Sequence, residues 1–116
     1  MPPLEGTWQL VELDGEAVPP GGAGREPHLV FDTKEARVSG SGGCNRLAGS
    51  FELSGEDLRF GPMAVTKMAC ADDVMRREDA FLRALGSVTR HELDGATLAV
   101  LAGERVVARL TQQLQA

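Results

Sequence analysis

The sequence is poor in aromatic residues, in cysteine and in long apolar runs. It contains no tyrosine, one tryptophan and two cysteines, and aromatic residues make up 4% of the chain. A core of this composition must be mainly aliphatic. No apolar run approaches the roughly 20 residues that a membrane-spanning helix needs, and the first residues lack the basic and apolar regions of a secretory signal. These absences predict a soluble globular chain without a transmembrane segment.

The chain also lacks any long run of basic residues, and its formal net charge is −5. Nucleic acids and anionic membrane surfaces both require a basic footprint on the protein that binds them, so neither is an expected partner. The 116 residues are enough for one hydrophobic core and too few for two ordinary domains. We therefore expect a single domain over residues 1–116, and we expect it to be a monomer.

Short apolar segments separated by turn residues dominate the sequence. Tight hairpin turns are expected at Asp14-Gly15, Asp94-Gly95 and Gly103-Glu104, because Asp-Gly and Gly-containing pairs favour such turns. This spacing predicts a mainly antiparallel sheet in which strands that are neighbours in sequence are paired. The expected strands are TWQLVEL, HLVF, ARVSG, SFELS, DLRF, RHEL, TLAVLA and RVVARL.

One segment, from about Asp72 to Leu85, has the periodicity of a helix. Asp72 and Asp73 suit its start by capping and by their charge near the helix dipole, and Gly86 suits its end. At about 100° per residue one face collects the apolar side chains, which predicts an amphipathic helix packed on the sheet. The apolar residues of this face are Val74, Met75, Phe81, Leu82 and Leu85.

Glu78 lies at the centre of this apolar face. An isolated buried carboxylate costs several kcal/mol, so Glu78 requires a hydrogen-bonding or cationic partner, or a path to solvent. The candidate partners are Asn45, Arg46, Thr66 and Lys67. We interpret Glu78 as a structural residue that fixes the helix to a loop, in preference to a catalytic carboxylate. Its replacement by alanine is expected to cost about 1 to 3 kcal/mol of stability.

Several motifs resemble the META domain family, also called HslJ-like. LEGTWQLVELDGEAV, GGCNRLAGSF, TKMAC, EDAFLRAL and HELDGATLAVL occur in the family's order and together cover the whole chain. The matching motif residues are Gly43, Asn45, Arg46, Thr66 and Glu78. The chain departs from the family at Leu47, where an aromatic residue is common, and at Ala48, which replaces a small polar residue.

The resemblance implies a fold and a cellular context, but no reaction. The implied fold is mainly β with one helix: a strongly curved antiparallel sheet, or incomplete barrel, with the single helix packed across it. Family members are associated with heat shock and other stress responses and with the bacterial cell envelope, often behind lipoprotein signals. The resemblance thus favours an extracytoplasmic or envelope location, whereas a chain complete as printed would be cytoplasmic. It implies no catalytic residue and no cofactor.

Cys44 and Cys70, 26 positions apart, allow two interpretations. A disulfide between them would tie the central loop to the start of the helix, and two buried free thiols would serve as small apolar residues. A zinc site is not expected, because His28, His91 and the two cysteines lack the short paired spacings of structural zinc ligands. Neither histidine is near a cysteine in sequence, so a cysteine nucleophile is not indicated either.

Two functional classes follow from these observations. The first is a non-enzymatic domain that acts through contacts with a protein partner. The second is a binder of a small apolar molecule or lipid in the concavity of the curved sheet, since curved sheets can enclose a lined cavity. An enzyme is not expected, because no acid, base or nucleophile occurs at a recognisable spacing.

Overall fold

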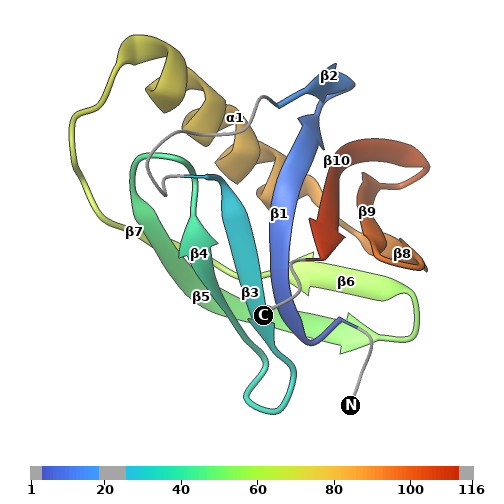
Figure 1. The fold of residues 1–116 in the computed structure, drawn as a ribbon. Coiled ribbons are helices and arrows are strands. Elements are labelled where there is room, and N and C mark those ends of the chain that lie inside the picture. Colours follow the sequence, from blue (N-terminus) through green and yellow to red (C-terminus); the bar gives the residue numbers. More distant parts are fainter. Residues whose placement is uncertain (1–3, 19–25, 113–116) are drawn as a thin grey trace.

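The computed structural model describes residues 4–18 and 26–112, and residues 1–3, 19–25 and 113–116 lie outside this description. The described chain forms a ten-stranded antiparallel sheet and one helix (Figure 1). The strands are β1 (Gly6–Leu13), β2 (Glu16–Ala17), β3 (His28–Asp32), β4 (Arg37–Ser41), β5 (Arg46–Ser54), β6 (Asp57–Phe60), β7 (Ala64–Val65), β8 (Arg90–Asp94), β9 (Thr97–Ala102) and β10 (Arg105–Gln112), and the helix is α1 (Asp72–Ser87).

The sheet curves until its two ends meet. Strands β1, β3, β4, β5, β6, β8, β9 and β10 follow one another around a ring, and β10 pairs with β1 to close it. The pairing around the ring is shortest between β6 and β8, where only Asp57 and Arg90 are paired among the described residues. Strand β2 pairs with the last residues of β1, and the two-residue β7 pairs with β5. The predicted fold class, a strongly curved antiparallel sheet with a single helix, is confirmed.

Most of the predicted turns occur where the sequence placed them. Asp14 and Gly15, both at positive φ, connect β1 to β2, and Gly103 and Glu104 connect β9 to β10. The third turn is shifted by one residue, because Asp94 still pairs with Thr97 and the turn consists of Gly95 and Ala96. Strand β5 is longer than the predicted SFELS and begins at Arg46.

Helix α1 begins at Asp72, as predicted, and runs two residues past the predicted end. Gly86 therefore lies inside the last turn, and Val88 is the residue that ends the helix. The residue before the helix, Ala71, provides no side-chain cap, so Asp72 and Asp73 act through their charge in the first turn. Within the described chain, no helix is both long and apolar enough to cross a membrane.

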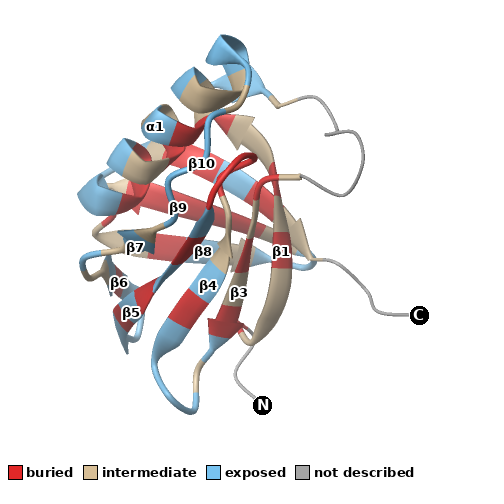
Figure 2. Ribbon diagram, turned by 90° about the vertical axis from the view of Figure 1, so that its left-hand side faces the viewer, coloured by how far each residue is buried: buried red, intermediate tan, exposed pale blue. Residues whose placement is uncertain are grey.

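The core fills the inside of the ring. Buried and exposed residues alternate along several strands (Figure 2). In β5, Leu47 and Phe51 are buried between exposed neighbours. The largest fully buried side chains are Trp8, Phe31 and Phe81, contributed by β1, β3 and α1. Because the helix contacts β6, β9 and β10, its buried residues pack against the strands on both sides of the β6–β8 gap.

Candidate functional site

The carboxylate of Glu78 lies inside the protein and accepts three hydrogen bonds from one loop. Its side chain is 3% exposed. Oε2 accepts from the backbone N–H groups of Cys44, at 3.0 Å, and Asn45, at 2.6 Å. Oε1 accepts from the side-chain amide of Asn45 at 2.7 Å. These three donors provide the partner that a buried carboxylate requires.

Two glycines allow the loop to reach this carboxylate. A Cβ at Gly42 would collide with Cγ of Glu78 and lie 2.8 Å from Oε2, so a larger residue would displace the carboxylate. Gly43 adopts a φ of 111°, which L-residues rarely adopt. This conformation turns the chain so that the next two N–H groups both point at Glu78, and the N–H of Gly43 itself donates to Oγ of Ser41.

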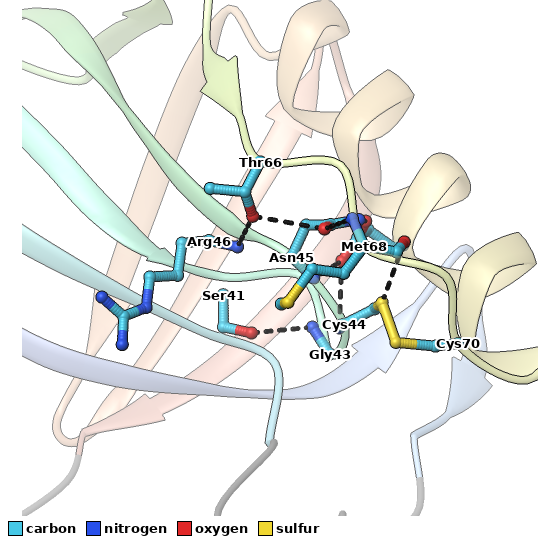
Figure 3. Close-up of a disulfide and its surroundings, with 9 residues drawn as sticks. Ser41, Gly43, Cys44, Asn45, Arg46, Thr66, Met68 and Cys70 are labelled. Carbon is cyan, nitrogen blue, oxygen red and sulfur yellow. Dashed lines mark hydrogen bonds between the residues drawn. A yellow bond between two sulfur atoms is a disulfide. The ribbon is translucent and has the colours of Figure 1, made fainter.

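Asn45 connects the same loop to the segment that precedes the helix. Its Oδ1 accepts from the N–H of Met68 at 2.6 Å and from Oγ1 of Thr66 at 3.2 Å. Thr66 also pairs with Arg46, through both its backbone N–H and its hydroxyl (Figure 3). We call the assembly of loop 41–46, segment 66–70 and Glu78 the clasp. Both the oxygen and the amide nitrogen of the Asn45 side chain are thus hydrogen-bonded within it.

Cys44 and Cys70 form a disulfide that joins the two segments of the clasp, with a Cα–Cα distance of 6.1 Å (Figure 3). Cys44 is 5% exposed, and its Sγ also lies 3.6 Å from the carbonyl oxygen of Met68. The two cysteines are therefore bonded to each other, and the alternative of two buried free thiols does not apply. The bond closes a loop that contains β5, β6 and β7.

The predicted partners of Glu78 are thereby resolved. Asn45 bonds Glu78 directly, and Thr66 is linked to it through Asn45. The Arg46 side chain extends away from the disulfide (Figure 3), and no hydrogen bond or ion pair joins it to the carboxylate in the described chain. Lys67 is exposed. In the described residues every buried side-chain nitrogen and oxygen has a hydrogen-bond partner, and no three His, Cys, Asp or Glu side chains gather as metal ligands. The clasp thus holds the loop and the helix together.

An open groove of about 810 Å³ lies beside the clasp, on the outer face of the sheet. Its floor is made of the alternate residues of β3, β4 and β5 that point away from the core, and its rim is formed by β7 and the clasp segment. The lining includes His28, Val30, Ser39, Ser41, Arg46, Ala48, Ala64, Thr66 and Met68.

Sequence reasoning identified Arg46 and Thr66 as motif residues but did not predict this groove. Its floor requires the register of three strands, and register depends on pairing across the sheet. Alternation in RLAGSF does place Arg46 and Ala48 on the side opposite the buried Leu47. That alternation was the signal available for finding the outward face.

With this geometry described, the chain can be compared with known proteins. The model of the META domain family matches residues 2–114. The chain belongs to the META domain family. No curated protein matches it. The motifs that suggested the resemblance lie within a family match over nearly the whole sequence, and three of them, GGCNRLAGSF, TKMAC and EDAFLRAL, contribute residues to the clasp of this META domain.

Solved structures show the same fold. A protein from Burkholderia xenovorans, solved by NMR, has a TM-score of 0.76 and 26% identity, over 96% of this chain and 83% of that one. A second NMR structure has a TM-score of 0.71 and 22% identity, over 93% and 89% of the two chains. A DUF4847-family protein from Bacteroides vulgatus ATCC 8482 shares the fold at 15% identity and a TM-score of 0.70, over 97% and 96%.

Proposed function

We propose that this META domain is a non-catalytic module that binds a small apolar ligand in the outer groove. The observation that carries the proposal is the groove itself. Its volume of about 810 Å³ lies within the roughly 300–1,000 Å³ range of small-molecule sites. Val30, Ala48 and Ala64, on β3, β5 and β7, provide an apolar strip that Ser39 of β4 interrupts. Met68 adds a flexible apolar side chain at the rim.

The groove is a better candidate than the concavity of the sheet. Side chains of the core, among them Trp8, Phe31 and Phe81, occupy the inside of the ring, and each is 1% exposed or less. A ligand inside would have to displace well-packed side chains, which costs several kcal/mol. The outer groove is open without any such rearrangement.

A small ligand is also better supported than a protein partner that docks on an apolar patch. In the described chain the large apolar side chains that are exposed are Leu53, at 38%, and Met68, at 46%. Leu53 belongs to the β5–β6 end of the sheet, whereas Met68 is at the groove. Two separated side chains do not make the contiguous patch of several hundred Å² that marks a protein interface.

The surroundings of the motif residues support a non-catalytic role. Glu78 has both oxygens engaged by the loop and is almost fully buried, so a substrate proton has no path to it. Cys44 and Cys70 are bonded to each other, and a disulfide sulfur is not a thiolate nucleophile.

The disulfide supports the envelope and stress context that the family resemblance implies. Disulfides persist in oxidising compartments and are rare in the reducing cytosol. A structural bond between Cys44 and Cys70 is consistent with a domain that works outside the cytoplasm, where stress on the envelope would act.

The test uses phenylnaphthylamine, an uncharged dye that fluoresces in apolar surroundings. The folded domain should enhance its fluorescence saturably, and Ala48→Trp should weaken binding at least tenfold by filling the groove. Glu52→Trp is the matched control, because Glu52 lies on the same strand and face but outside the groove lining. It should bind like the unmodified domain. Absence of saturable binding, or equal binding by both variants, would refute the proposal.

A further inference from the structure

The outward residues of the groove are arranged in two parallel rows of different character. Register pairs His28 with Ser41 and Ser41 with Arg46, which makes a polar row across β3, β4 and β5. Two residues along each strand, Val30 pairs with Ser39, Ser39 with Ala48 and Ala48 with Ala64. This second row is apolar except for one hydroxyl. The two rows are about 7 Å apart, the span of two residues in a strand.

Among the described residues that line the groove, Arg46 of the polar row is the one Lys or Arg side chain. Arg46 is exposed, and its guanidinium makes no ion pair within the described chain. The lining residues that the structure describes include no Asp or Glu, although the whole protein has a net charge of −5. By contrast, Arg90 and Arg109 each lie 3.1 Å from a glutamate. The groove is thus a locally cationic site on an acidic protein.

Of the two neighbours of Arg46 in the row, Ser41 is suited to assist an anion, whereas His28 is not. Oγ of Ser41 accepts a hydrogen bond from Gly43, so its own proton can be donated outward. Nδ1 of His28 lies 2.9 Å from the carbonyl oxygen of Glu26. A carbonyl only accepts, so we assign the proton to Nδ1. Nε2 of the neutral ring is then an acceptor and offers no donor to an anion.

We propose that the ligand of this groove is a small amphiphilic acid, whose carboxylate lies on the polar row and whose hydrocarbon part lies on the apolar row. The guanidinium of Arg46 is the anchor, because its planar fork matches a carboxylate. The hydrocarbon covers Val30, Ala48 and Ala64 and contacts Met68. This inference rests on the proposed function and specifies the class of ligand.

The experiment compares octanoate with octanol, which share a chain and differ in the charged group. Binding is measured by displacement of phenylnaphthylamine and by calorimetry, on the unmodified domain and on Arg46→Gln and Arg46→Lys. Arg37→Gln is the matched control, since Arg37 is an exposed outward cation of neighbouring strand β4 outside the groove lining.

Octanoate should bind at least tenfold more tightly than octanol, since a hydrogen bond to a charged group contributes about that factor. Arg46→Gln should remove this preference by weakening octanoate binding far more than octanol binding, Arg46→Lys should retain part of the preference, and Arg37→Gln should retain all of it. Equal binding of octanoate and octanol, or a preference that survives in Arg46→Gln, would overturn the acid-group inference while the groove function stands. If the dye and both compounds fail to bind, the proposed function falls, and the inference with it.

Discussion

Replacing Glu78 by alanine removes the acceptor of three buried hydrogen bonds at once. The donors are two backbone N–H groups, of Cys44 and Asn45, and the side-chain amide of Asn45. None of them can turn to another acceptor, because the backbone is fixed by the turn at Gly43 and the Asn45 oxygen is already used by Met68 and Thr66. At about 1 kcal/mol for each orphaned donor, we expect a loss of about 3 kcal/mol in the free energy of unfolding.

Glu78→Gln separates the loss of an acceptor from the loss of the whole side chain. The amide oxygen can replace Oε2 and accept from both backbone N–H groups, but the new NH₂ group then faces the Asn45 amide, donor against donor. Asn45 cannot flip to relieve this contact, since its oxygen holds Met68. We therefore expect a smaller loss, of about 1 to 2 kcal/mol.

The assay is urea unfolding followed by circular dichroism, with the disulfide kept oxidised. Asp79→Ala is the control, because Asp79 is the next residue of the same helix and is exposed. Its effect should stay within about 0.5 kcal/mol, as for most surface substitutions. If Glu78→Ala is as stable as Asp79→Ala, the carboxylate does not hold the clasp and the structural reading of Glu78 is refuted.

Two further predictions concern the clasp. Gly42→Ala should lower the melting temperature and cost about 2 kcal/mol in the free energy of unfolding, because the new methyl group collides with the buried carboxylate. Gly86→Ala is the control, a helical position with open space around the added atom, and it should leave the free energy of unfolding unchanged or raise it by up to about 1 kcal/mol. Equal effects of the two substitutions would contradict the steric argument. Thiol titration of the denatured, unreduced protein should detect no free cysteine, and two reactive thiols before reduction would exclude the Cys44–Cys70 bond. Reduction should lower the free energy of unfolding by about 3.5 kcal/mol, on the chain-entropy estimate for a 26-residue separation.

Local periodicity predicted much of the fold and, within the clasp, the buried position of Glu78 on the helix. The helical wheel placed Glu78 among apolar residues, and such placement depends only on the geometry of one helix. The donors that satisfy it are 33 and 34 residues away in sequence, and no local pattern determines such a contact. Asn45 could be named as a candidate because it belongs to a recognisable motif, while Arg46 from the same motif points elsewhere.

Features that depend on pairing across the sheet could not be predicted in this way. Strand β7 has two residues, too few for an alternation, and exists because it pairs with Leu47 and Ala48 of β5. The two rows of the groove likewise arise from the register of β3, β4 and β5. A shift of one residue in any of these strands would turn Arg46 or Val30 toward the core.

The pairing of β1 with β10 has a consequence for how the protein is made. Glu12 and Arg109 meet at this joint although 97 residues separate them in sequence. On the ribosome, β1 emerges early and lacks this neighbour until β10 has also emerged. Until then the edge of β1 presents unpaired backbone groups, which are templates for association with other chains. The emergence of β10 from the ribosome therefore ends this exposure. Before that step, protection of the nascent chain against association with other chains has its greatest effect.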